Sequence, residues 1–280
     1  MEENNTTFTY KYPRPAVTTD CVIFGFDGHD LMVLLIERGA EPYKGMWAFP
    51  GGFMRMEETL EECALRELRE ETSLEPGMVE QFHAFSSVHR DPRERVITVA
   101  FYALVKMAEV RGGDDANDAR WFKVDDVPAL AFDHDYILRV AMKQLRESMF
   151  FKPVGFELLG DVFSVPQLQR LYEAILGVQF DRRNFYRKIM QLGILDPVEE
   201  PVEEKSPRFY GKKKEMKEQD IDALFHESLP KVVSCCINRE TADFLQQPVH
   251  KEAGRKPQLF RFNRKKYELL KERGDFRLEW

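Results

Sequence analysis

The sequence predicts an α/β domain followed by a smaller α+β domain. Two observations predict this order: strand and helix patterns interleave through residues 1–150, whereas two compact helices with short apolar strands around them occupy residues 155–280. A chain of 280 residues has room for two ordinary domains. The helical pattern gives way to Lys152-Pro153-Val154-Gly155, which places the domain boundary near residues 150–155.

The first domain is expected to open with a hairpin. Apolar residues cluster within 20–38 on both sides of Asp27-Gly28-His29-Asp30, as in two strands joined by a tight turn. Residues 59–72 contain no Gly or Pro and repeat apolar residues at helical spacing, so they predict an amphipathic helix. A further strand is expected at 96–105 and a second helix at 135–148.

The second domain is expected to begin with a helix-turn-helix. Ser164-Val165-Pro166 is a typical helix start, and the apolar spacing that follows continues to Gly177. A second helix is expected from the cap residue Asp181 to Gly193. Residues 194–196 and 259–262 are expected to pair as the strands of a wing, with a long charged insertion between them at about 198–254.

Composition and charge exclude several classes of protein. With 43% hydrophobic and 32% charged residues, the chain is neither disordered nor membrane-spanning. The polar start, residues 1–17, lacks the apolar segment of a secretory signal, and the four cysteines show no regular spacing, so we expect a cytoplasmic protein. Residues 1–150 carry a net charge of −10 and residues 151–280 a net charge of +3, which favours two modules with different partners.

The most informative segment runs from Gly51 to Leu74. On a helix, Glu67 and Glu71 lie about 40° apart and Glu70 about 60° to the other side, so three carboxylates crowd one face. A divalent ion such as Mg²⁺, which prefers oxygen ligands, would offset their repulsion. The alternative is a glutamate-rich helix with a solvated face. In the same segment, Arg66 lies four residues before Glu70 and is placed to orient its carboxylate. The Gly51-Gly52 pair lets the backbone approach the site closely.

This segment resembles the Nudix box, with Gly52, Glu58, Arg66, Glu67, Leu68, Glu70, Glu71 and Leu74 in register. One departure is Ser73, where the box normally carries Gly. The resemblance implies an α/β/α sandwich around a mixed sheet, and an enzyme that uses Mg²⁺ or Mn²⁺ to hydrolyse a nucleoside diphosphate linked to another group. By carry-over, the expected catalytic residues are Arg66, Glu67, Glu70 and Glu71, and the expected metal ligands are Glu58, Glu67, Glu70 and Glu71.

Residues that flank the box resemble the Nudix group that handles ADP-ribose. They lie in 47–53, 87–93, 121–122 and 130–134. Arginines are expected to clamp phosphates, and an aromatic residue to stack near the substrate. Alternatively, Arg90 and Arg93 are turn residues around Asp91-Pro92, and His134 is a structural histidine. The expected substrate-binding residues are Arg38, Trp47, Phe49, Gly51, Gly52, Arg90 and Arg93.

The second helix of the C-terminal domain carries donor side chains suited to phosphates and base edges. The alternative interpretation is that this segment is a charged surface helix packed on a core. The run from Phe156 to Leu195 resembles the winged helix of Nudix-related transcriptional regulators, and this resemblance implies double-stranded DNA as a partner and a homodimer. The segment 198–254 departs from the pattern. The expected DNA-binding residues are Arg182, Arg183, Asn184, Arg187, Lys188, Arg255 and Lys256.

The sequence thus favours a regulator that senses ADP-ribose or a related nucleoside-diphosphate sugar, binds DNA and retains hydrolase activity. A metal-dependent ADP-ribose pyrophosphatase with a structural C-terminal domain is the alternative, because the Arg66 to Glu71 core is complete. A non-catalytic dimerising scaffold is a third interpretation.

Overall fold

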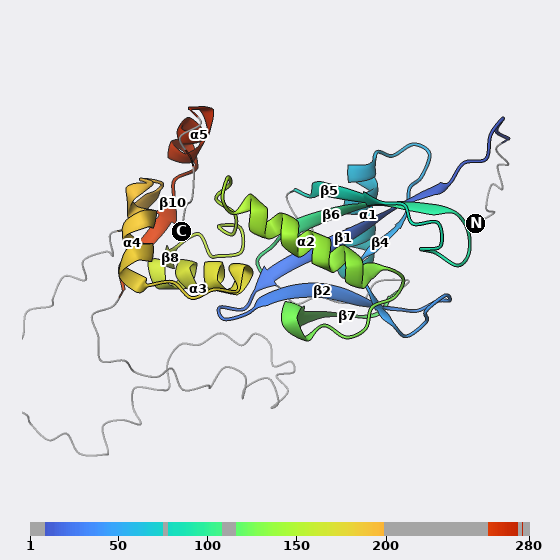
Figure 1. Ribbon diagram of the computed structural model, residues 1–280, viewed down its shortest axis with the longest axis horizontal. Coiled ribbons are helices and arrows are strands. Elements are labelled where there is room, and N and C mark those ends of the chain that lie inside the picture. The colour runs from blue at the N-terminus through green and yellow to red at the C-terminus, as the bar shows by residue number, and fades with distance from the viewer. Residues whose placement is uncertain (1–8, 75–77, 108–115, 199–256, 274–275, 277–280) are drawn as a thin grey trace, which may run out of the picture. The chain divides into compact units, whose positions relative to one another are not determined.

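The computed structural model confirms an α/β domain followed by an α+β winged-helix domain (Figure 1). It describes residues 9–74, 78–107, 116–198, 257–273 and Phe276. Within these residues, none of the helices is long and apolar enough to cross a membrane. The insertion predicted at about 198–254 lies almost entirely outside the described residues.

The first domain is built on a mixed sheet of seven strands. The sheet runs β3-β2-β1-β6-β5, with β4 added beside β1 and β7 beside β2. Strands β1 and β6 are parallel, and the other pairs are antiparallel. The predicted hairpin is confirmed, because Phe26 pairs with Leu31 across the turn. The strands are β1 (Ala16–Phe26), β2 (Leu31–Arg38), β3 (Trp47–Ala48), β4 (Gly51–Phe53), β5 (Glu80–Phe85), β6 (Val96–Leu104) and β7 (Ala116–Lys123).

Two helices, α1 (Leu60–Thr72) and α2 (His134–Ser148), cover opposite faces of this sheet (Figure 1). Successive side chains of a strand point to opposite faces, so β1 contributes to both layers. Cys21 and Ile23 belong to the buried cluster that contains Ala64 and Leu68 of α1, whereas Val22 and Phe24 belong to the cluster that contains Ile137 and Ala141 of α2. This arrangement is the predicted α/β/α sandwich.

Local signals in the sequence determine the bounds of α1. Thr59 is its N-cap and forms a capping box: its hydroxyl accepts a hydrogen bond from the Glu62 backbone N–H at 3.2 Å, and the Glu62 carboxylate accepts from the Thr59 N–H at 2.8 Å. At the other end Ser73 adopts a left-handed conformation with φ of 59°, and its N–H donates to the Arg69 carbonyl. A serine therefore performs the turn for which glycine is the usual residue.

The second domain contains the predicted helix-turn-helix. Ser164 and Gln167 form a capping box at the start of α3 (Val165–Leu176), and Asp181 caps α4 (Arg182–Gln191). The predicted wing pairing is confirmed, since β9 (Leu195–Pro197) is antiparallel to β10 (Leu259–Phe262). The remaining elements are β8 (Phe163–Ser164) and α5 (Arg264–Glu272).

Candidate active site and ligand pocket

A polar cavity of about 440 Å³ lies in the first domain, lined by residues of β1, β2, β4 and α1 and of the loops near residues 90 and 132. Its lining is strongly charged. The acidic side chains are Asp20, Glu41, Glu67, Glu70, Glu71 and Asp91, and the basic ones are Arg38, Arg55, Arg66, Arg90 and Arg93.

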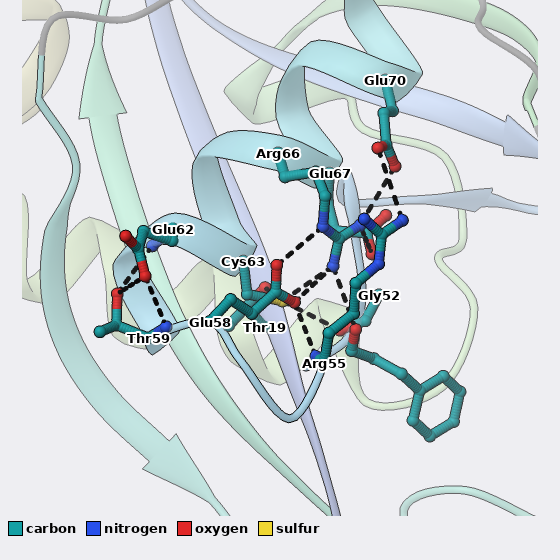
Figure 2. A network of polar contacts seen from close by, with 11 residues as sticks. Thr19, Gly52, Arg55, Glu58, Thr59, Glu62, Cys63, Arg66, Glu67 and Glu70 are labelled. Carbon is teal, nitrogen blue, oxygen red and sulfur yellow. Dashed lines mark hydrogen bonds and ion pairs between the residues drawn. The ribbon is translucent and has the colours of Figure 1, made fainter. Parts of the chain in front are cut away.

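Arg66 links three carboxylates of the box, those of Glu58, Glu67 and Glu70, into one network (Figure 2). Its Nε and Nη2 donate to the two oxygens of Glu58 at 2.9 and 2.6 Å, and its Nη1 donates to Glu67 at 2.6 Å and Glu70 at 3.1 Å. The network also reaches the carbonyl of Phe53, to which Nη2 donates at 3.2 Å. Arg66 therefore lines the cavity while its guanidinium is bonded to three carboxylates and one carbonyl of the protein.

The two carboxylates nearest Arg66 differ in their electrostatics. Hydrogen bonds from Arg66 lower the pKa of Glu58 to about 2, so this residue stays ionised and paired. Burial instead raises the pKa of Glu67, against the opposing effect of Arg66. A raised carboxylate pKa in a cavity is typical of a group that binds a cation or a proton during function. Glu67 lines the cavity and Glu58 does not, so Glu67 is the stronger functional candidate of the two.

Glu71 and Glu70 lie differently around the cavity. Glu71 is buried, and its Oε2 accepts a hydrogen bond from the Gly51 N–H at 2.8 Å. Glu70 is half-exposed and lies 3.7 Å from the Arg55 guanidinium. Among the described residues, no three His, Cys, Asp or Glu side chains form a ready metal-binding cluster. The available donors are nevertheless all carboxylate oxygens, which suit Mg²⁺ or Mn²⁺.

The predicted close approach of the glycine pair is present. A Cβ on Gly52 would collide with the Glu67 carboxylate, and a Cβ on Gly51 would collide with the Thr19 carbonyl oxygen. Gly51 therefore requires glycine for space, because its obstacle is backbone, whereas a side chain at Gly52 would displace the Glu67 carboxylate. Next to them, the buried Phe49 ring stacks on His134 with centroids 5.1 Å apart.

Arg90 has a different environment from the one expected of a phosphate clamp. Its side chain is only 4% exposed, and it donates to both oxygens of Asp133 at 3.1 and 2.8 Å and to Asp20 at 3.4 Å. His134 completes this cluster: its Nδ1 accepts from the Phe49 N–H at 3.0 Å. These bonds join the 130–134 loop to the sheet, because Asp133 lies in that loop and Asp20 lies on β1. His134 lines the cavity as well, with its Nδ1 engaged by a backbone N–H of the protein.

Arg38 and Arg93 both line the cavity beside Phe132. Their guanidinium carbons lie 4.8 and 5.9 Å from the centre of that ring. Trp47 does not line the cavity: its ring packs edge-on against Phe122 at 4.7 Å, which separates it from the other expected substrate-binding residues.

The expected DNA-binding side chains of α4 lie mainly on its exposed face. Arg182, Arg183, Asn184 and Arg187 are exposed and Lys188 is half-buried. On the opposite side Phe185 and Ile189 are buried, and the Phe185 ring contacts Tyr172 of α3 edge-on at 5.9 Å. The remaining two residues, Arg255 and Lys256, lie outside the described residues.

Sequence reasoning missed several cavity residues, among them Asp20, Phe53, Arg55 and Phe132. Asp20 lies on β1 and Phe53 on β4, and these two strands pair with each other, so only the sheet register brings the two residues together. Phe132 stands in the quoted 130–134 segment, and its φ of 54°, unusual for a bulky residue, is visible only in the structure.

The fold and the cavity define a class of protein: a Nudix domain joined to a DNA-binding winged helix. Residues 14–141 match the NUDIX domain family, and residues 155–210 match the NrtR DNA-binding winged helix domain family. The "ADPR responsive transcriptional repressor NtrR" of Acinetobacter baylyi is 31% identical over 194 residues, covering 68% of this chain and 78% of that protein. The chain belongs to this family of Nudix-related transcriptional regulators.

Two further relatives represent hydrolysis of ADP-ribose and binding of DNA. An "ADP-ribose pyrophosphatase" of Methanocaldococcus jannaschii is 42% identical over 132 residues, which are 47% of this chain and 76% of that enzyme. The crystal structure of Shewanella oneidensis NrtR in complex with a 27mer DNA is similar with a TM-score of 0.56 and 29% identity, over 66% of this chain and 88% of that one.

Proposed function

We propose that this protein is a transcriptional regulator that senses ADP-ribose, or a related nucleoside-diphosphate sugar, in the Nudix cavity and binds DNA through α4 and the wing. One observation carries the proposal: the same chain holds a charged cavity beside the box helix and a second domain whose α4 exposes three arginines. The Acinetobacter relative, named as responsive to ADP-ribose, is similar across both domains.

The regulation that we propose follows from linkage. A ligand shifts DNA binding only if it binds two conformations of the protein with different affinity. We further propose a homodimer, because two winged helices related by a two-fold axis match the symmetry of a palindromic operator. A DNA partner also supports the cytoplasmic location expected from the sequence.

The test is a titration of the full-length protein with a labelled duplex from its own upstream region, at one fixed salt concentration. We expect specific binding that is about 1,000-fold tighter than binding to a random duplex of equal length. We also expect ADP-ribose to change the specific affinity and leave the random one unchanged. Equal affinity for both duplexes, with and without ADP-ribose, would remove the regulatory proposal.

The second candidate function is hydrolysis of the same ligand, and the intact Arg66 network favours it. A divalent ion bound here would neutralise charge on the diphosphate and lower the pKa of a water molecule. Glu67, Glu70 and Glu71 are the proposed ligands of that ion. Arg66 holds Glu67 and Glu70, while the Gly51 N–H orients Glu71.

Glu71→Gln tests this activity. The amide keeps an oxygen for the Gly51 N–H but removes the negative charge, so we expect release of AMP from ADP-ribose with Mg²⁺ to fall about 100-fold. The matched control is Glu62→Gln, in the first turn of the same helix and outside the cavity lining, which should leave the rate unchanged. Equal rates in wild type and Glu71→Gln would eliminate the catalytic role.

A further inference from the structure

The turn of the helix-turn-helix is held by two side chains of α3. This turn comprises residues 177–181, between the last residue of α3 and the first residue of α4. Gln169 and Glu173 lie four residues apart on α3, so they face the same side of the helix. The Gln169 Nε2 donates to the Glu173 Oε1 at 2.9 Å, which joins the two side chains into a pair.

This pair binds both backbone groups of Phe180. The Phe180 N–H donates to the Glu173 Oε1 at 2.8 Å, and the Phe180 carbonyl accepts from the Gln169 Nε2 at 3.0 Å. Because the N–H and the carbonyl of one residue belong to successive planar peptide units, the two hydrogen bonds fix the backbone on both sides of Phe180. The turn clamp is the name used below for Gln169, Glu173 and the Phe180 backbone.

The turn clamp is connected directly to α4. The Phe180 ring lies 5.5 Å from the ring of Phe185, measured between centroids, and Phe185 is buried on the inner face of α4. The residue after Phe180 is the N-cap Asp181, which accepts a hydrogen bond from the Asn184 N–H at 2.9 Å. The turn clamp therefore sets where the first turn of α4 begins and how that turn is directed.

The direction of α4 matters more for contacts with bases than for contacts with phosphates. In a helix-turn-helix, the N-terminal residues of the second helix reach base edges in the major groove. Hydrogen bonds to base edges require donors and acceptors at fixed positions, whereas attraction to the phosphates depends mainly on charge. A small rotation of α4 would therefore weaken binding to the correct sequence and leave binding to other sequences nearly unchanged.

The charge of Glu173 is notable in this setting. Its side chain is half-buried and forms no ion pair with any described residue. A carboxylate within a DNA-binding domain opposes the attraction of phosphates. Hydrogen bonds to an ionised acceptor are, however, about twice as strong as those to a neutral one. Glu173 is therefore suited to hold the turn, although its charge disfavours DNA.

We propose that Gln169 and Glu173 are positioning residues of α4, and that they determine how well the protein distinguishes its operator from other DNA. The proposal rests on the proposed function and deepens it, because it adds two residues of α3 that act through the turn. Its consequence is that specificity depends on the turn between the two helices as well as on the side chains of α4.

The test is an anisotropy titration of the full-length protein with the duplex from its upstream region and with a random duplex of equal length, at one salt concentration. Glu173→Ala and Gln169→Ala should each weaken specific binding about tenfold, while random binding changes by less than about twofold. Glu173→Gln keeps an oxygen that accepts both hydrogen bonds, so it should restore specific binding. The double alanine variant should lose little more than the weaker single variant, since both side chains hold the same residue.

The matched control is Glu268→Ala. Glu268 is an exposed carboxylate on α5 of the same domain, 4.0 Å from Lys271, so its removal changes the charge equally and should leave the ratio of specific to random affinity unchanged. The thermal midpoint reports whether each variant is folded, and Gln169→Ala tests the turn clamp if Glu173→Ala does not fold.

Three results would overturn the turn clamp and leave the proposed function intact. These are an unchanged affinity ratio in both alanine variants, an equal loss for the two duplexes, and a loss in Glu173→Gln or Glu268→Ala as large as that in Glu173→Ala. Equal affinity of the wild-type protein for the two duplexes would instead contradict the proposed function itself.

Discussion

At the scale of single residues, Arg66 is the side chain on which the box depends. It is 14% exposed, and its partners Glu58 and Glu67 are 12% and 15% exposed. Removing one member of such a group leaves the others desolvated and unpaired. The hydrogen bonds that Arg66 donates to Glu58 and Glu67 raise the pKa of the arginine, so its charge is fixed.

We expect Arg66→Ala to lower the free energy of unfolding by about 3 kcal/mol, because Glu58 and Glu67 lose their counter-charge. Urea denaturation at pH 7 measures this change. The comparison is Lys143→Ala on α2, which removes an exposed i, i+4 pair with Glu147 at 3.8 Å and should cost less than about 0.5 kcal/mol. A cost below 1 kcal/mol for Arg66→Ala would mean that the network contributes little to stability.

His134 gives a prediction for pH dependence. Burial lowers the pKa of this histidine, so the folded protein keeps it neutral while the unfolded chain takes up a proton near pH 6.5. Stability should therefore fall as the pH drops below about 6.5, by at most about 1.4 kcal/mol per pH unit for one proton. The charged groups around it are Asp20 and Asp133, which raise its pKa, and Arg90 and Arg38, which lower it.

His134→Asn isolates this contribution, since an amide oxygen can still accept from the Phe49 N–H but does not titrate. The free energy of unfolding, measured by urea between pH 7.5 and 5.5, should decrease less steeply in the variant than in wild type. Parallel pH profiles for the two proteins would show that His134 contributes nothing to acid sensitivity.

At the scale of elements, the ends of α1 show how much the sequence determines locally. The predicted helix over 59–72 is α1 with Thr59 as its cap, because capping and apolar spacing are properties of neighbouring residues. The same reasoning predicted α3, α4 and the hairpin. It did not predict β7, whose sequence Ala116–Lys123 mixes charged and apolar residues and becomes a strand by pairing with β2.

The candidate site also contains contacts that the local sequence predicts and contacts that it does not predict. The carboxylates and Arg66 lie within one helix and one turn, so their spacing in the sequence predicts their contacts. The environment of Arg90 depends on Asp20 and Asp133, which are 70 and 43 residues away, and no local pattern reports such a pairing. Arg90, which the resemblance predicts to clamp phosphate, lines the cavity and is paired there with these two carboxylates.

The C-cap of α1 can be tested at Ser73. Its left-handed backbone is strained for any residue with a Cβ atom, so Ser73→Gly should raise the free energy of unfolding by about 0.5–1 kcal/mol. Thermal or urea denaturation measures the gain. Ser73→Ala keeps the Cβ and should bring no such gain, so equal stabilisation by both substitutions would place the effect elsewhere than in the backbone conformation.

The exposed face of α4 gives the corresponding prediction for DNA. Arg183→Ala with Arg187→Ala should weaken operator binding by about tenfold or more, since arginines supply the strongest contacts to guanine edges and phosphates. Anisotropy titrations at several salt concentrations separate the two contributions, because each lost phosphate contact lowers the salt slope by about 1. Arg139→Ala with Lys143→Ala, both exposed on α2 of the Nudix domain, is the charge-matched control, and an equal loss in it would argue against α4 as the DNA-binding element.

At the scale of the whole molecule, the chain joins an acidic first module to a weakly basic second one, with net charges of −10 over residues 1–150 and +3 over 151–280. The two charges suit the two partners that we propose, a nucleotide ligand and DNA. The carboxylates of α1 and the arginines on Phe132 line one cavity, so a diphosphate between them would contact both.

The most direct measurement is a crystal structure of the full chain with Mg²⁺ and a non-hydrolysable ADP-ribose analogue. The account predicts a diphosphate in the Nudix cavity, with the ion on Glu67, Glu70 and Glu71 and with Arg38 and Arg93 on phosphate oxygens. An analogue bound elsewhere, with those carboxylates turned toward bulk water and the cavity empty, would contradict it.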